Sequence, residues 1–494
     1  MLLCLSLPLF GQDVASFEKR VTVTKLTNGL TVILIERHDA PVFSFATFVD
    51  AGSSQDPLGK TGLAHMMEHM AFKGTDEIGT GDFAAEKLSL EKLEAAYAAY
   101  NEENQKSFDR DEKKLAELEK AWKDAIAEAD KHVVKNEFGE IVEREGGEDL
   151  NAYTNLDETV YFYSLPANRI ELWAYLESSR FLHPVLRQFY TERDVVTEER
   201  RMRTDSNPVG RLEEQFTAMA FDGSPYHRPT IGYASDLKHF SATDAKHFFA
   251  TYYVPSNITI AVAGDIDPNK MLPLLEKYFG RIPASPKPQE YEPKDPPQDS
   301  TRSVTLQSPS QPIYLEGYHR PDYRDPDDAV YDALTDLLSD GRTSRLYRAL
   351  VRDKKLALAA GGESGYPGTK YPHLFIFYGV PAPNHTNQEV AAAIHAEIER
   401  LKTEDVSDAE LQMFKTRARA SIIRSLDDNS TLARMLAEVQ ARYGDWHELF
   451  NQLGRIDKVS KADIRRVANT VFTDNNRTTG ASETAKPAAQ GGQQ

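Results

Sequence analysis

The sequence predicts an α+β protein built from two related lobes, and three observations support this prediction. Strand-like alternation and amphipathic helical patterns follow one another along the 494 residues. A proline-rich, charged stretch at residues 284–302 has the composition of a semi-extended linker. After this stretch the order of elements, strands followed by helices, begins again, which indicates that the two halves are related.

Composition and charge exclude several classes of function. The hydrophobic content of 40% is typical of globular lobes. The formal net charge of -18 argues against a nucleic-acid-binding protein, because phosphates require a basic surface. It argues equally against electrostatic docking on anionic lipid. Beyond the N-terminus, no stretch of the sequence approaches the length of a transmembrane helix.

Residues 1–16 are predicted to be a signal segment. The run at residues 1–11 is apolar and the chain is polar from Gln12, which is typical of the end of a secretory signal peptide whose charged start is missing. Cys4 is the only cysteine, so a lipid-modified cysteine is the competing interpretation, and a disordered apolar N-terminus is a third. A mature chain without cysteine suits an oxidising compartment. We therefore expect an exported protein, periplasmic or secreted.

The first lobe is predicted to span residues 17–283 and to begin with strands. Asn28-Gly29 is a turn signal between two strand patterns, and a third apolar strand pattern follows. Asp56-Pro57 then opens a helix. The three expected strands lie at residues 21–23, 30–35 and 42–49.

This helix contains the motif H-x-x-E-H, in which the ends are His65 and His69. Two histidines four residues apart project from one helix face, so both imidazoles can reach one tetrahedral metal ion. Glu68 lies on the same face and could take a proton from a metal-bound water. The alternative is a pair of ordinary histidines on an amphipathic helix, but a carboxylate in register favours zinc. The motif is also a known peptidase signature.

A charge-dense, alanine-rich segment at about residues 83–134 predicts a helical insertion. Leu93, Tyr97 and Tyr100 form one apolar stripe, and a second stripe runs through residues 115–129. The polar residues between the stripes indicate an antiparallel pair of long helices that projects from the body. A structural decoration is the simplest role for it; a lid, gate or docking element is the alternative.

A hairpin of β-forming residues is predicted after the insertion. Its first strand contains Asn151, Ala152, Tyr153 and Thr154, and its second lies at residues 160–163. The remaining elements of the first lobe are helical patterns at 169–181, 192–203 and 209–221, a strand at 258–263 and a helix at 269–279.

A catalytic zinc normally has three protein ligands, so the chain should hold one more. The best candidate lies in the charged helix at residues 192–203. Glu192 and Glu199 are seven residues apart and share one face, whereas Glu198 points away by about 100 degrees. A solvated charged helix is the alternative, and the pattern alone favours that alternative.

The second lobe is predicted to span residues 303–475. Residues 476–494 are small and polar and predict a disordered tail. The strands expected in the second lobe lie at 303–306, 312–317, 358–361 and 374–379, and the helices at 329–338, 344–351, 387–401, 408–425, 430–443 and 461–471.

Three motifs together resemble the pitrilysin family of zinc peptidases, the inverzincins, which include insulin-degrading enzyme and the mitochondrial processing peptidases. They are H-x-x-E-H, the hairpin sequence N-A-Y-T, and E-R-x-V-V-x-x-E. The likeness extends from about Val23 to Val471. It implies a fold of two lobes, each with a mostly antiparallel sheet covered by helices.

The resemblance also implies a site and an activity. His65, His69 and Glu199 would bind one Zn²⁺ per chain, Glu68 would be the catalytic base, and Glu192 would steady the site. The activity implied is that of a zinc-dependent endopeptidase acting on peptides or unfolded polypeptides. Residues 151–154 would form an edge strand that pairs with the substrate backbone, which predicts broad selectivity. Relatives of this size commonly form homodimers or heterodimers with a related chain.

The chain departs from the family pattern in two places. The separation between His69 and Glu199 exceeds the usual one, and the helical insertion accounts for the excess. In the second lobe Arg352 resembles a substrate-binding arginine of the family, but the position of a companion tyrosine is taken by Leu358. A non-catalytic peptide-binding or scaffolding partner of an active peptidase is therefore the alternative function. A metal-storage or transport protein would need several metal-binding clusters, and the sequence shows one.

Overall fold

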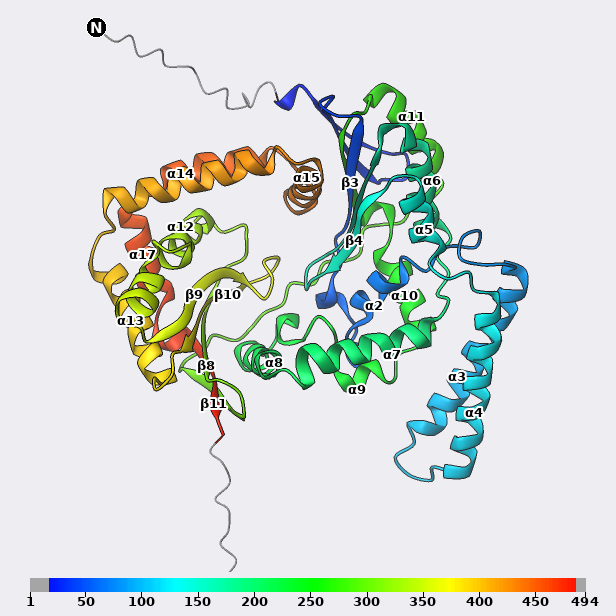
Figure 1. Cartoon of the computed structure of the whole chain (residues 1–494), viewed down its shortest axis with the longest axis horizontal. Coiled ribbons are helices and arrows are strands. Elements are labelled where there is room, and N and C mark those ends of the chain that lie inside the picture. Colours follow the sequence, from blue (N-terminus) through cyan, green and yellow to red (C-terminus); the bar gives the residue numbers. More distant parts are fainter. Residues whose placement is uncertain (1–16, 486–494) are drawn as a thin grey trace, which may run out of the picture.

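The computed structural model describes residues 17–485 and consists of two lobes, each built on one β-sheet with helices packed on it (Figure 1). This confirms the predicted α+β class. The signal segment predicted at residues 1–16, with Cys4, lies outside the described residues, as do residues 486–494. None of the helices within 17–485 is long and apolar enough to cross a membrane.

The sheet of the first lobe has six strands, and its order places β4 at one edge. Only the pair β2–β6 is parallel; the other neighbours are antiparallel. The central strand β6 is buried along its whole length, in keeping with its sequence ITIAVAG. In sheet order the strands are β1 (Val21–Lys25), β2 (Thr31–Glu36), β6 (Ile258–Gly264), β3 (Val42–Val49), β5 (Thr159–Pro166) and β4 (Glu148–Thr154).

The sheet of the second lobe has five strands, of which only β7 and β11 pair in parallel. The other three neighbouring pairs are antiparallel, so both sheets are mostly antiparallel, as expected. In sheet order the strands are β7 (Arg302–Ser308), β11 (Arg477–Thr484), β8 (Ile313–Arg320), β10 (His373–Pro381) and β9 (Ala357–Tyr366).

The prediction of a disordered tail at residues 476–494 is wrong for residues 477–484, which form β11 inside this sheet. The composition misled because small polar residues are common in disordered segments. Here they are required by packing: Thr478 and Ser482 are fully buried, and a Cβ atom on Gly480 would lie 3.1 Å from the ring of Phe216. Backbone pairing on both sides of β11 offsets its small apolar content.

One helix from each half of the chain packs on the sheet of the other half. Helix α8 (Pro208–Ala220) follows the first-lobe helices in sequence but packs on the second sheet, where Leu212 and Phe216 join its core. Helix α15 (Asn429–Tyr443) belongs to the second half but packs on β3 and β6 of the first sheet, where Leu432 and Leu436 are fully buried. Figure 1 shows α15 beside β3 and α8 beside the second sheet. The two lobes therefore share apolar cores.

The remaining helices come from both halves of the chain. In the first half they are α2 (Leu63–Met70), α3 (Phe83–Asn104), α4 (Glu112–Ala129), α5 (Glu137–Arg144), α6 (Ile170–Leu182), α7 (Phe189–Arg200), α9 (Ala234–Leu237), α10 (Ala242–Tyr252) and α11 (Pro268–Phe279). In the second half they are α12 (Asp328–Ser339), α13 (Asn387–Thr403), α14 (Asp408–Ser425), α16 (Glu448–Lys458) and α17 (Lys461–Val471).

Helices α3 and α4 form the predicted antiparallel pair and project from the body of the first lobe (Figure 1). Aspartates at both N-caps accept hydrogen bonds from first-turn N–H groups, which explains where each helix begins. Tyr97 of α3 and Trp122 of α4 pack together, with ring centroids 5.3 Å apart. Phe108, in the connecting loop, is 87% exposed.

We predict that Phe216→Ala destabilises the protein by about 3–5 kcal/mol, because the ring is 1% exposed and fills the space above the glycines of the second sheet. Met219→Ala on the same helix is the control, since Met219 is 37% exposed, and it should change stability little. Urea denaturation measures both. Equal effects of the two variants would show that α8 does not hold the lobes together.

Candidate metal centre

Helix α2 begins at a tight, capped turn that fixes the direction of the H-x-x-E-H motif. The carboxylate of Asp56 accepts hydrogen bonds from the backbone N–H groups of Gly62 (2.7 Å) and Ala64 (2.9 Å). Gly62 has a φ of 95°, and a Cβ atom there would lie 2.7 Å from the carbonyl oxygen of Ile231. Leu63, Met66, Met67 and Met70 anchor the opposite face of the helix in the core.

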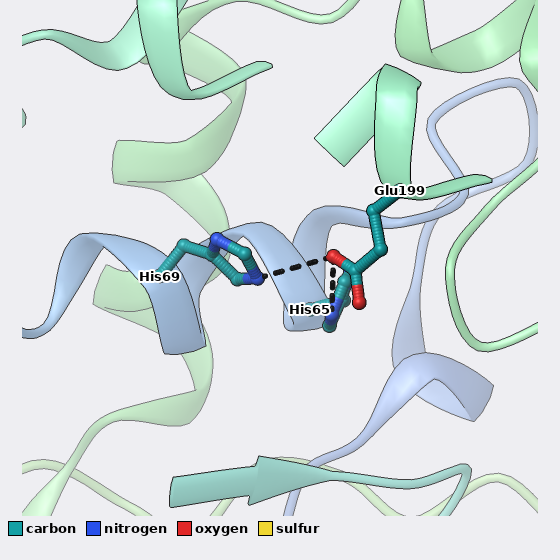
Figure 2. Close-up of side chains that lie close together, drawn as sticks. All are labelled: His65, His69 and Glu199. Carbon is teal, nitrogen blue, oxygen red and sulfur yellow. Dashed lines mark ion pairs between the residues drawn. The ribbon is translucent and has the colours of Figure 1, made fainter. Parts of the chain in front are cut away.

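His65, His69 and Glu199 converge on one point (Figure 2). Nε2 of His65 lies 3.7 Å and Nε2 of His69 lies 3.5 Å from Oε2 of Glu199. One ligand atom from each residue lies within 4.8 Å of the other two. Hydrogen bonds between nitrogen and oxygen are about 2.7–3.2 Å long, so these three potential ligand atoms face one another without forming hydrogen bonds. Two imidazole nitrogens and one carboxylate oxygen, gathered in this way, fit a catalytic zinc site.

Helix α7 carries both glutamates of the predicted E-x6-E pattern to α2. Oε1 of Glu192 is 3.0 Å from Nδ1 of His69, and Nζ of Lys73 is 2.5 Å from Oε2 of Glu192. The other oxygen of Glu199 pairs with Arg203 at 2.9 Å. Glu198 points to solvent, as the helical spacing predicts, and pairs there with Arg201.

The surroundings of the two histidines act on them in opposite directions. Burial lowers the pKa of His65 to about 3, helped by the charges of His69 and Arg203, so this imidazole is neutral at pH 7. Neutral imidazole is the form that binds metal ions. Burial also lowers the pKa of His69, but the hydrogen bond to Glu192 and the nearby carboxylates outweigh it and raise the pKa overall. The hydrogen bond between Nδ1 and Glu192 therefore holds the imidazole of His69 in orientation.

Glu68 faces the same cleft as the three converging residues. Burial raises its pKa, while a hydrogen bond with Thr154 and the charge of His69 act against this rise. A partly buried carboxylate with a raised pKa is suited to accept a proton near neutral pH. Thr154 is the last residue of β4, and the motif helix packs beside this strand.

A cleft of about 830 Å³ opens over these residues. Residues 151–154 of β4 form one of its walls, and β4 is the edge strand of its sheet, as the sequence predicts. Asn151 is exposed, and Ala152, Tyr153 and Thr154 are half-buried. A smaller cavity of about 500 Å³ adjoins Glu68 and His69 on the other side and is lined in part by residues 133–136, where the chain returns from the helical insertion.

The structure does not bring Arg352 to either cavity. It lies in the helical turn Tyr347–Asp353, is exposed, and its guanidinium is bound by Asp353. Leu358 is also exposed, on β9. The second-lobe residues that do line the large cleft are Tyr366 and Pro367, which the sequence analysis missed. Lys73 was missed as well, although its place four residues after His69 could have indicated it.

Two models of one peptidase family match most of the chain. Residues 31–128 and 122–233 match "Insulinase (Peptidase family M16)", and residues 239–417 match "Peptidase M16 inactive domain". The first match is in two segments that meet within α4, where the helical insertion interrupts the family pattern. His65, Glu68, His69 and Glu199 all fall within the insulinase match.

Individual relatives agree with this assignment. The chain is 29% identical to zinc protease PqqE of Helicobacter pylori over 93% of this chain and 92% of that protein. It is 24% identical to the mitochondrial-processing peptidase subunit beta of Saccharomyces cerevisiae, over 90% and 87% of the two chains. Among solved structures, a protease from Helicobacter pylori superposes with a TM-score of 0.77 and 27% identity, over 94% of this chain and 99% of that chain.

The fold, the residues of the motif helix and the matched family models lead to one conclusion. This chain belongs to the M16 peptidase family, and its relatives include proteins named as zinc proteases.

Proposed function

We propose that this protein is a zinc-dependent endopeptidase that hydrolyses peptides or unfolded polypeptides. The observation that carries the proposal is the convergence of His65, His69 and Glu199 beside Glu68, in a cleft bounded by an edge strand. The names of the zinc-protease relatives support the same activity.

The metal would be one Zn²⁺ per chain, held by the two histidines of α2 and by Glu199. When bound, zinc supplies Lewis acidity, which polarises a carbonyl and lowers the pKa of water at the site. Glu192 orients His69 through Nδ1, and Lys73 holds Glu192 in place from the other side. This arrangement keeps Nε2 of His69 directed at the point of convergence.

Glu68 is the proposed general base. Its carboxylate would take the proton of the attacking water and pass it to the amine that leaves after the peptide bond breaks. Glu68 and Thr154 line the same cleft, which places the carboxylate next to the strand that would hold the substrate.

The edge strand β4 is the proposed binding surface for the peptide backbone, with residues 151–154 opposite the scissile bond. Main-chain pairing gives affinity without reading most side chains, so selectivity would be broad. Arg352 stays a predicted substrate-binding residue, although in this structure it pairs with Asp353 and does not line the cleft.

Export and assembly are further parts of the proposal. The apolar run at residues 1–11 supports secretion to the periplasm or beyond. The yeast relative is named as a subunit, which supports pairing with a second copy or with a related chain.

The alternative function is a non-catalytic partner that binds peptides beside an active relative. The exposed positions of Arg352 and Leu358 favour it, because neither contributes to the cleft. Purified protein that binds zinc and peptide but cleaves no peptide would establish this alternative.

Replacing the proposed base should abolish catalysis and leave the metal in place. Glu68→Gln keeps the shape of the side chain but cannot accept the proton, so we expect kcat to fall by about 10²–10⁴-fold. Peptide cleavage gives kcat, and inductively coupled plasma mass spectrometry gives the zinc content. Full activity of this variant would refute the mechanism.

The third ligand can be tested with two neighbouring glutamates. Glu199→Gln should lower zinc occupancy strongly, because it removes one of three protein ligands. Glu198→Gln is the matched control. The Glu198 side chain is 61% exposed, and within residues 17–485 its ion pair is with Arg201. Zinc titration against a chelator compares the two. Equal zinc affinity in both variants would remove Glu199 from the site.

Glu192 should act on zinc affinity through His69. Glu192→Gln removes the charge from the partner of Nδ1 and from the ion pair with Lys73. We expect zinc to bind about 10–100-fold more weakly, with the fold intact. Competition with a chelator measures the affinity and circular dichroism the fold. An unchanged affinity would show that Glu192 has no part in orienting the ligand.

A further inference from the structure

The turn between β4 and β5 is bonded to the second lobe through one buried carboxylate. Asp157 is 2% exposed. Its Oδ1 accepts a hydrogen bond from the hydroxyl of Tyr226 at 2.5 Å. Its Oδ2 accepts from the backbone N–H groups of Thr369 (2.7 Å) and Lys370 (3.0 Å). Three donors therefore meet on Asp157, and two of them belong to the backbone of the second lobe.

Charged side chains hold the same segment of the second lobe at other points. Nζ of Lys370 lies 2.5 Å from Oδ1 of Asp50, the residue that follows β3. Arg442, near the end of α15, binds Glu158 at 2.7 Å and donates to Oγ1 of Thr369 at 2.7 Å. Glu158 is 3% exposed, so this ion pair is also largely shielded from water.

The segment held in this way forms a wall of the large cleft. Tyr366 and Pro367 line the cleft, and they lie three and two residues before Thr369, the first of the residues bonded to Asp157. Gly368 lies between Pro367 and Thr369, and a Cβ atom there would be 2.8 Å from Oδ2 of Asp157 and 2.7 Å from the hydroxyl of Tyr226. Only glycine allows the segment to approach the carboxylate this closely.

On the first-lobe side, the turn is rigidly connected to the motif helix. It continues directly from β4, and the backbone N–H of Ser53 donates to the carbonyl of Asn155 at 3.0 Å. Ser54 likewise donates to Leu156 at 2.9 Å. Ser53 and Ser54 belong to a short helical turn, Ser53–Gln55, which leads to Asp56, and Asp56 caps α2. Asp157 is therefore fixed relative to both β4 and the motif, while it holds the opposite wall.

From these contacts we infer that Asp157 is a positioning residue for peptide binding. It seats Tyr366 and Pro367 against the cleft, so that an extended peptide is clasped between β4 and the second lobe. The inference rests on the proposed peptidase function. Without the carboxylate, the partly buried N–H groups of Thr369 and Lys370 lose their acceptor, which favours a shift of the segment away from the cleft.

The test compares Asp157→Ala with Asp157→Asn. The asparagine oxygen can still accept from the backbone N–H groups, and its amide can donate to Tyr226, so this variant should rescue binding. We expect Asp157→Ala to raise KM for a peptide by about tenfold with kcat within about threefold, which is the signature of lost uniform binding. Asp157→Asn should stay within about threefold of the unaltered protein in both constants.

Glu410→Ala is the matched control for loss of a structural carboxylate. Glu410 accepts hydrogen bonds from Arg345 and from the backbone N–H of Ser407, both inside the second lobe and away from the cleft. Its removal should lower stability without raising KM. An equal rise of KM in the two alanine variants would mean that Asp157 acts only through general stability, and the inference would fall.

A double-mutant cycle tests whether Asp157 acts through the cleft wall. If it does, Asp157→Ala should have little further effect on KM in a protein that already carries Tyr366→Ala. Fully additive effects would show that the two residues act independently and would overturn the inference.

Two readouts do not depend on catalysis. In the Glu68→Gln background, Asp157→Ala should weaken the binding of a fluorescently labelled extended peptide, measured by anisotropy. The amide hydrogens of Thr369 and Lys370 should also exchange faster with solvent. If the unaltered protein cleaves no peptide, the proposed function fails, yet these two changes would still support the role of Asp157. Unchanged peptide affinity would refute it.

Discussion

The contact between α7 and α2 is the interaction on which the metal centre depends. Glu192 joins Nδ1 of His69 on one side and the ammonium group of Lys73 on the other, and both of these groups come from α2 or the residues just after it. Once this contact fixes the register of the two helices, the seven-residue spacing places Glu199 two turns further on, opposite His65. A charged helix that would otherwise be solvated thereby becomes part of a buried site.

The helical insertion also packs against α7 and the residues just before it. Arg193 of α7 donates to the hydroxyl of Tyr97 at 2.7 Å and lies over the rings of Tyr97 and Trp122. Arg187, which is 1% exposed, pairs with Glu86 of α3 and donates to the carbonyl of Lys73. The insertion therefore lengthens the chain between His69 and Glu199 without separating them, because Glu86 and Tyr97 of α3 are bonded to Arg187 and Arg193 at α7.

The exchange of α8 and α15 between the lobes gives the cleft its fixed walls. Each sheet buries apolar residues of a helix from the other half, so the lobes cannot separate without exposing Phe216 on one side and Leu436 on the other. The polar contacts of Asp157 and Arg442 also join the two lobes. Packing holds the lobes together, and hydrogen bonds set how the second lobe meets the edge strand.

The sequence by itself determined the local features. The spacing of H-x-x-E-H, the strand alternation, the paired long helices and the hairpin follow from short-range patterns, and all appear in the structure. Glu199 was only one of several glutamates on a charged helix until the family resemblance singled it out, since periodicity gives a face but not what that face meets. The strand β11 was misjudged for the same reason: its small residues are explained by the ring of Phe216 above Gly480, far away in sequence. Tyr366 lines the cleft and Arg352 does not. The reason is that the orientation of the second lobe depends on contacts between residues more than 200 positions apart, such as Asp157 with Thr369. Such long-range contacts have no local signature, so only the tertiary structure revealed them.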